Sequence, residues 1–139
     1  MTRWVALALL AAMIPTGSPA FQARESLARG GSYFDQCVAR AKDYSACIGY
    51  FMGMADAPVM NADKSADEAV YCLPAGASYE QNRDVFHTYL RENPQIRDVS
   101  THMLFLLAMN TSFPCKNSPK LSVDPATGEV FMSASKPQE

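Results

Sequence analysis

Four cysteines constrain the fold of this 139-residue chain more than any other feature. Successive cysteines lie ten, twenty-five and forty-three residues apart, so no two of them form the close C-x-x-C pair of a structural zinc site. An even number of cysteines in an exported chain is typical of a disulfide framework. We therefore predict two disulfides among Cys37, Cys47, Cys72 and Cys115, and we expect neither a metal ion nor another cofactor.

The N-terminus predicts that the chain is exported. Arg3 is followed by an uninterrupted apolar run of eleven residues, 4–14, whereas a membrane-spanning helix needs about 20. Ser18 and Ala20 place small residues at the −3 and −1 positions of a cleavage site. We expect a signal peptide over residues 1–20, cleavage after Ala20, and a periplasmic product that has no membrane-spanning segment.

The part that follows, residues 21–139, has the size of one domain. The formal net charge is −2 for the whole chain and about −3 once Arg3 is removed, and no basic patch stands out. This charge argues against a nucleic acid partner. The composition changes after Cys115, which divides this part into a helical domain over residues 21–115 and a C-terminal extension over residues 116–139.

Apolar residues recur at helical spacing in four stretches of the domain, which predicts an all-α, disulfide-linked bundle of about four helices. Ser45 is the expected N-cap of the second helix, and Ser78 with Gln81 forms a capping box before the third. Residues 58–77, between these helices, are polar and interrupted by proline and glycine, which predicts a loop. The four predicted helices cover residues 25–41, with Ser32 as an alternative start after Gly30 and Gly31, then 45–57, 79–93 and 99–112.

The extension contains two short β-prone segments, residues 121–123 and 129–132, on either side of a turn-rich centre. This pattern predicts a β-hairpin. Because an isolated hairpin is only marginally stable in water, it must dock on the helices to be ordered. Residues 133–139 are expected to be disordered.

Small residues follow one side of the second helix at three- and four-residue steps, namely Ala46, Gly49, Gly53 and Ala57. Each glycine inside a helix costs about 1 kcal/mol relative to alanine, so another contact should compensate for it. The interpretation we favour is close packing of the second helix on the fourth within one chain. The alternative is an interface with another subunit.

The predicted helices also bear on the disulfide pairing. If the third and fourth helices are antiparallel, Cys72 and Cys115 lie at the same end of the pair. Cys37 and Cys47 lie near the connection between the first and second helices. Of the three pairings that four cysteines allow, Cys37–Cys47 with Cys72–Cys115 is therefore the first choice, although sequence alone leaves the other two open.

Catalytic patterns are weak in this sequence. The only histidines are His87 and His102, and His87 has Asp84 one helical turn before it. A general base oriented by Asp84 is one interpretation, and side-chain pairing on a solvated helix face is the one we favour. The serine-hydrolase, zinc-protease and phosphate-loop motifs are absent from the sequence. We therefore predict that the protein is not an enzyme.

An ordered set of short motifs resembles the Rap/Tai family of type VI secretion immunity proteins. The set consists of C-x-G-Y-x-x-G-x-x-D-A from Cys47, C-L-P from Cys72, Y-L-x-x-x-P from Tyr89 and F-P-C ending at Cys115. The resemblance covers residues 32–115. Its signature positions, which we expect to support the fold, are Gly49, Tyr50, Gly53, Asp56, Pro74, Leu90 and Pro114.

This resemblance implies a small helical periplasmic protein, often a homodimer, that binds a peptidoglycan amidase toxin and plugs its substrate groove. Because the signature residues report the fold, we expect toxin contacts on the 59–71 loop and on the polar face of the third helix. The candidate partner-binding residues are Asp63, Lys64, Asp67, Glu68, Arg83, His87 and Arg91. A periplasmic chaperone of the HdeA type is the alternative function, and a hydrolase built around Asp84 and His87 is a third.

Overall fold

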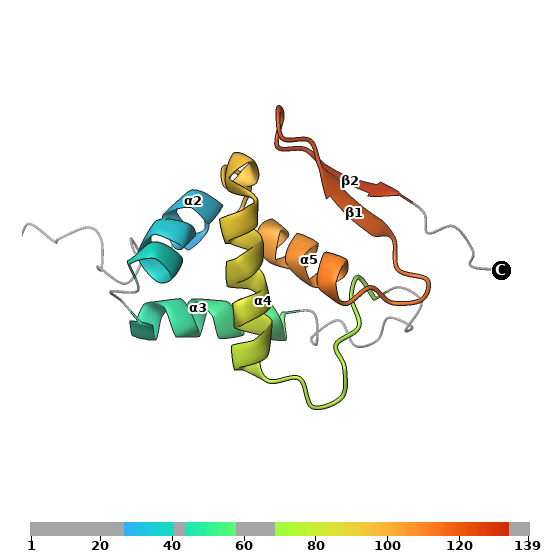
Figure 1. Ribbon diagram of the computed structural model, residues 1–139, viewed down its shortest axis with the longest axis horizontal. Coiled ribbons are helices and arrows are strands. Elements are labelled where there is room, and N and C mark those ends of the chain that lie inside the picture. Colours follow the sequence, from blue (N-terminus) through green and yellow to red (C-terminus); the bar gives the residue numbers. More distant parts are fainter. Residues whose placement is uncertain (1–26, 41–43, 58–68, 134–139) are drawn as a thin grey trace, which may run out of the picture.

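The computed structural model describes residues 27–40, 44–57 and 69–133. The expected signal peptide and the residues beyond 133 lie outside the described residues. The described part is mostly helical with a short C-terminal hairpin, as predicted, and Figure 1 places α2 and the hairpin at opposite ends of its long axis. Its elements are α2 Gly30–Tyr33, the π-helix η1 Phe34–Ala39, α3 Tyr44–Asp56, α4 Tyr79–Glu92, the 3-10 turn η4 Pro94–Ile96, α5 Thr101–Ser112, β1 Lys120–Val123 and β2 Val130–Ser133.

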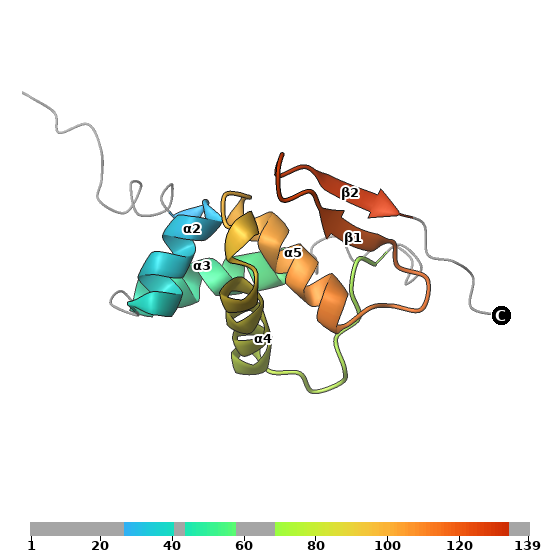
Figure 2. The same cartoon turned by 45° about the horizontal axis from the view of Figure 1, so that its top comes forward.

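Helix α5 forms the centre of the packing, because it contacts α2, α4 and β1. Figures 1 and 2 show α4 crossing α3 and the hairpin lying along α5. Leu104, Phe105, Leu107, Ala108 and Met109 are all buried, as expected for a helix that is apolar on every side. Ser100 caps this helix by accepting a hydrogen bond from the Met103 amide, so α5 begins two residues later than predicted.

The capping box predicted before α4 is present. The Ser78 hydroxyl accepts from the Gln81 amide, and the Gln81 side chain accepts from the Ser78 amide. At the other end, Arg97 donates from Nε and Nη2 to the Leu90 carbonyl at 2.9 and 2.7 Å, and its guanidinium stacks 3.4 Å from the centre of the Phe34 ring. Because a cation satisfies a C-terminal carbonyl here, Arg97 stabilises the end of α4 and also joins it to η1.

The first helix differs from its prediction. Regular α-helix covers only Gly30–Tyr33, after which the chain continues as a π-helix to Ala39. The amides of Gly30 and Gly31 donate to the carbonyls of Val99 and Arg97 at 3.1 and 2.7 Å. The two glycines therefore let this backbone pack directly against the segment before α5, and the helix begins at the glycine pair instead of after it.

Gly30 is expected to tolerate no side chain. A Cβ added there would lie 2.2 Å from Leu104 Cδ1 and 2.9 Å from the carbonyl oxygens of Arg97 and Val99. We expect Gly30→Ala to lower the free energy of unfolding by about 3 kcal/mol, the upper range for overpacking. Urea unfolding measures this effect. Gly53→Ala is the matched control, since nothing lies within 4 Å of its added Cβ and alanine should raise stability by about 1 kcal/mol. Equal effects of the two variants would contradict this prediction.

Two predictions about helix α3 are wrong. Ser45 lies inside the helix, whose described part already includes Tyr44, so it is not the N-cap. The favoured packing of Gly49 and Gly53 on the fourth helix is also wrong, because nothing lies within 4 Å of a Cβ built on either glycine. The buried side of α3 is instead formed by Cys47, Phe51 and Met54. Helix α3 thus presents its glycines outward.

Two disulfides join the elements, Cys37–Cys47 and Cys72–Cys115, which is the pairing favoured by the sequence. The first links η1 to α3. The second ties the irregular segment before α4 to the chain just after α5, where the Cys72 amide also donates to the Phe113 carbonyl at 2.8 Å.

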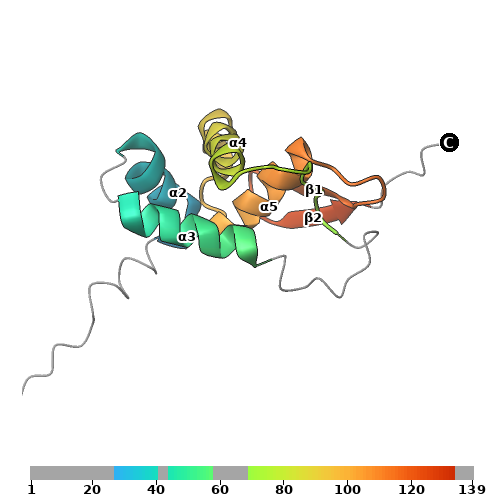
Figure 3. The same cartoon turned by 90° about the horizontal axis from the view of Figure 1, so that it is seen from below.

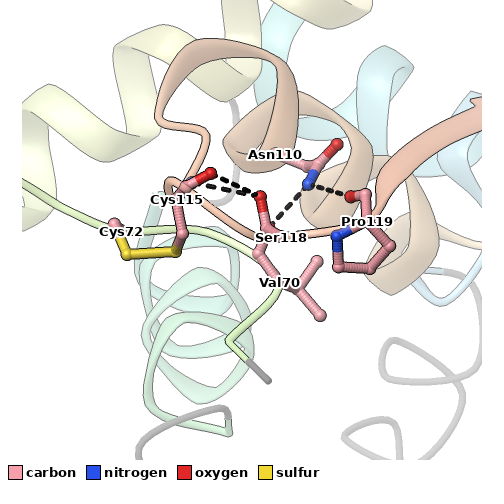
Figure 4. Close-up of a disulfide and its surroundings, with 6 residues drawn as sticks. All are labelled: Val70, Cys72, Asn110, Cys115, Ser118 and Pro119. Atoms are coloured by element: carbon pink, nitrogen blue, oxygen red, sulfur yellow. Dashed lines mark hydrogen bonds between the residues drawn. A yellow bond between two sulfur atoms is a disulfide. The ribbon is translucent and has the colours of Figure 1, made fainter. Parts of the chain in front are cut away.

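Asn110 connects three segments beside the second disulfide, as Figure 4 shows. Its Nδ2 donates to the carbonyls of Val70 at 2.6 Å and Pro119 at 2.9 Å, and its Oδ1 accepts from the Leu121 amide at 2.9 Å. Leu121 is itself buried against the core. The predicted hairpin is therefore present and docked, and it extends to Ser133, where disorder was expected to begin.

Candidate interaction surface

The predicted partner-binding residues divide between two parts of the chain. Asp63, Lys64, Asp67 and Glu68 lie outside the described residues. Arg83, His87 and Arg91 follow one another at four-residue steps along α4, where Arg91 is exposed and the other two are half-buried. The structure therefore places three of the seven candidates on one side of one helix.

Arg83 joins α4 to the beginning of α3. Its Nη1 donates to the Tyr44 hydroxyl at 3.1 Å, and its Nη2 lies 3.5 Å from Asp84 Oδ1. Asp84 thus faces Arg83, and no contact between Asp84 and His87 is seen among the described residues. This arrangement offers no support for a hydrolase in which Asp84 orients His87.

A second link joins α4 to the end of α3. The Tyr79 hydroxyl donates a short hydrogen bond to the Asp56 carboxylate, and this bond raises the pKa of Tyr79 above its usual value. Tyr79 and Arg83 are one helical turn apart, so the same side of α4 holds both ends of α3. Figure 1 shows the two helices crossing, and in Figure 3 α4 is seen nearly end-on beside α3.

Three neighbouring exposed residues of α3 form what we call the α3 face: Gly49, Met52 and Gly53. From Tyr44 to Ala55 the helix carries no charged residue. A helix that is apolar on all sides is normally surrounded by protein. The α3 face is uncovered in the described structure, and Tyr44 and Tyr79, 60% and 43% exposed, lie beside it.

His87 is not on a fully solvated surface, contrary to the interpretation we favoured. It is half-buried, its Nε2 lies 3.2 Å from the Tyr33 hydroxyl, and its ring packs edge-on against the buried Tyr33 ring. Burial, followed by the positive charges of Arg83 and Arg91, lowers its pKa from 6.5 to about 4. His87 is therefore neutral at neutral pH and helps to hold α4 against α2.

This lowered pKa predicts that acid weakens the fold. The unfolded chain binds a proton near pH 6.5 but the folded chain does not, so stability is complete above pH 6.5 and falls as the pH approaches 4. Because His87 is only partly buried, we expect a loss of about 1 kcal/mol or less per pH unit. Urea unfolding between pH 7.5 and 5 measures it.

Substituting each histidine in turn separates the effect of His87 on acid stability from the titration of carboxylates. His87→Gln should remove most of the loss between pH 6.5 and 5. His102→Gln, which replaces an exposed histidine on α5, should leave it unchanged. A pH dependence that is the same in both variants would rule out His87 as its source.

A cleft of about 560 Å³ lies elsewhere, between the segment that enters α5 and the tip of the hairpin. Ile96, Val99 and Met103 line it from one side, and residues 124–128 line it from the other. None of the candidate residues borders this cleft. Sequence reasoning missed it because one wall comes from the C-terminal extension.

The signature positions have mixed roles. Leu90 is buried, and Tyr50 packs on Tyr33 with ring centres 6.0 Å apart. Pro74 and Pro114 are exposed and flank the Cys72–Cys115 disulfide. Asp56 serves the fold by joining α3 to α4 through Tyr79. Gly49 and Gly53 lie on the α3 face, so the expectation that the signature serves only the fold does not account for these two.

The described ranges contain neither a candidate metal site nor a helix that could span a membrane. No group of three or more histidine, cysteine, aspartate or glutamate residues there is placed to hold a metal ion. None of the helices in the same ranges has the length and apolar character needed to cross a membrane.

Comparison with known proteins gives one match. The family model described as Rap1a immunity proteins matches residues 29–115. Neither the curated proteins nor the solved structures contain a match. The matched segment includes α2, α3, α4, α5 and both disulfides, whereas the hairpin lies beyond it.

Proposed function

This chain belongs to the Rap1a immunity protein family, and on that premise we propose that it protects its own cell from a peptidoglycan amidase delivered by a type VI secretion system. We place the protein in the periplasm, where its signal peptide would direct it and where disulfides persist. There it binds the incoming amidase and occupies the substrate groove, so the cell wall stays intact. The protein contributes a binding surface and no catalytic group of its own.

The uncovered α3 face is the observation that carries this proposal. Two glycines lie inside α3, each costing about 1 kcal/mol, and no contact within the described structure compensates for them. The backbone of a partner protein packed against Gly49 and Gly53 would compensate for this cost in helix stability. Met52 belongs to this surface, and Tyr44 and Arg83 lie beside it. Methionine, aromatic residues and arginine are enriched in protein interfaces.

The predicted contacts on α4 belong to the same surface. Arg83 is bonded to Tyr44 at the edge of the α3 face, so a partner seated on α3 also meets α4. Arg91 is exposed further along the same side. We therefore propose that the effector contacts α3 and the Arg83–Arg91 side of α4 together.

A direct inhibition assay tests this function. The amidase to use is the one encoded beside the gene for this protein, and its hydrolysis of peptidoglycan is measured with increasing amounts of the purified chain. We expect complete inhibition near equimolar ratio. Full amidase activity at a large molar excess would refute the proposal, and binding of many unrelated unfolded proteins would favour a chaperone instead.

Arginine substitutions on α3 test whether the amidase binds the α3 face. Gly49→Arg and Gly53→Arg should each weaken amidase binding at least about 100-fold, since a long side chain would hold the partner away. Both variants should still fold, because the added side chains meet open space. Ser122→Arg on the exposed side of the hairpin is the matched control and should inhibit like the unchanged protein.

The resemblance also implies that the protein forms a homodimer. If the effector occupies α3, a homodimer needs another surface.

A further inference from the structure

Two exposed tyrosines lie beside the α3 face, one near each end of the helix. Tyr44 is the first described residue of α3, and Tyr79 reaches from α4 to Asp56, the last residue of α3. Tyr44 is 60% exposed and Tyr79 is 43% exposed. Three of the six large apolar residues that are exposed in the described part, these two and Met52, are therefore found at α3.

Both tyrosine rings are held in place by their hydroxyl groups. The Tyr44 hydroxyl accepts a hydrogen bond from Arg83 Nη1 at 3.1 Å, and the Tyr79 hydroxyl donates to the Asp56 carboxylate. Each bond joins a side chain of α3 to one of α4. The far end of each ring is thus fixed to a second helix, although the ring itself is open to solvent.

Such rings are well suited to bind another protein. Tyrosine supplies a large contact area with only two rotatable bonds, and it is enriched among the residues that contribute most to binding. Ordering a free side chain on binding costs entropy, and a ring that is already held avoids much of that cost. Because Gly49 and Gly53 have no side chains, Tyr44, Tyr79 and Met52 offer most of the side-chain contact area at the α3 face.

We propose that Tyr44 and Tyr79 determine the affinity for the effector, and that Arg83 and Asp56 are positioning residues that hold the two rings. This inference rests on the proposed function and adds which side chains supply the binding energy. It also changes the role expected for Arg83, which acts mainly through Tyr44 instead of contacting the effector itself. Neither tyrosine was among the candidate partner-binding residues of the sequence.

Removing each ring tests the affinity-determining role. Tyr44→Ala and Tyr79→Ala should each weaken inhibition of the neighbouring amidase at least about 30-fold, the effect of truncating a residue central to binding. Phe131→Ala is the matched control and should inhibit like the unchanged protein. Phe131 is 48% exposed, between the two tyrosines, and lies on the hairpin, with α5 between it and α3 in Figures 1 and 2.

Thermal unfolding separates lost binding from lost folding. All three alanine variants remove an exposed side chain, so their unfolding midpoints should stay within about 4 °C of the unchanged protein. If Tyr79→Ala unfolds earlier than that, Tyr79→Phe replaces it, since phenylalanine keeps the ring and removes only the hydrogen bond to Asp56. This second variant should weaken inhibition about five- to tenfold, because the ring is present but no longer held.

Variants of the positioning residues test how the rings are held. Asp56→Ala should weaken inhibition as much as Tyr79→Phe, and combining the two should cost no more than either alone. Asp56→Asn should restore inhibition, because its amide oxygen can still accept from the Tyr79 hydroxyl. Arg83→Met should likewise weaken inhibition in the unchanged chain but not in Tyr44→Phe, where the bond is already lost. A merely structural role would change the unfolding midpoint and leave inhibition at saturating concentration unaffected.

The outcomes distinguish this inference from the proposed function. If the unchanged chain does not inhibit the amidase, both fail together. If it does inhibit, and Tyr44→Ala and Tyr79→Ala inhibit equally well, the function stands and the inference is overturned. An equal loss in Phe131→Ala would overturn it too, and so would additive effects of Asp56→Ala and Tyr79→Phe.

Discussion

Asn110→Ala is expected to lower the free energy of unfolding by about 3–5 kcal/mol, a large effect for a single substitution. Asn110 is 4% exposed and satisfies three backbone groups, the carbonyls of Val70 and Pro119 and the amide of Leu121. Alanine leaves these groups without a partner in a buried place, and each such group costs about 1–3 kcal/mol. The value is measured by urea unfolding at neutral pH.

The control for Asn110 is the next residue of the same helix. Thr111 is exposed, so Thr111→Ala should change stability by less than about 0.5 kcal/mol. The loss in Asn110→Ala should also appear locally, as faster hydrogen exchange of the Leu121 amide. If stability falls by less than about 1 kcal/mol, the three segments do not depend on Asn110 for their attachment.

Removing the Cys72–Cys115 disulfide is expected to cost about 4 kcal/mol. A disulfide stabilises mainly by restricting the unfolded chain, and the effect grows with the loop it closes. This one spans 43 residues, whereas Cys37–Cys47 spans ten. By the same relation, the paired serine variant of Cys37 and Cys47 should lose only about 2.7 kcal/mol.

The comparison of the two double-serine variants is the informative measurement. Denaturant unfolding of each variant, beside the unchanged protein, gives the two losses under identical conditions. A larger loss from the short-loop disulfide would mean that packing around Cys37 and Cys47, both buried, outweighs chain entropy. Unchanged stability after full reduction of the native protein would contradict both values.

Local patterns were sufficient where a feature depends on residues close in sequence. The Ser78–Gln81 capping box was predictable because its four hydrogen-bonding groups lie within one helical turn. The burial of α5 followed from apolar residues on all its sides. The hairpin followed from two β-prone segments around a turn, and the family followed from short motifs in a fixed order.

The glycines of this chain show where prediction from local sequence patterns fails. Two glycine pairs interrupt helical patterns here, and the sequence does not show which glycine is confined. At Gly30 and Gly31 the chain approaches the backbone of residues 97–99, and a side chain at Gly30 would collide with it. At Gly49 and Gly53 there is only open space. The prediction that the second pair packs on the fourth helix failed because the difference depends on a segment distant in sequence.

His87 and Asn110 show the same limit for polar residues. His87 follows Asp84 at helical spacing, which suggested a surface pair, yet Tyr33 covers it from another helix. Nothing in the sequence predicted that Asn110, within a buried apolar helix, would form structural hydrogen bonds. Its three partners come from segments up to forty residues away. Both residues acquire their roles from contacts that no local window contains.

The sequence by itself determined the helices, the hairpin and the family, because these follow from periodicity, capping and motif order along the chain. It also favoured the disulfide pairing that the structure has. Only the tertiary structure decided which side of α3 faces outward and that Gly30 is confined whereas Gly49 and Gly53 are not. Those properties depend on how segments far apart in the chain pack together, and the free energy of packing is not encoded at any single position.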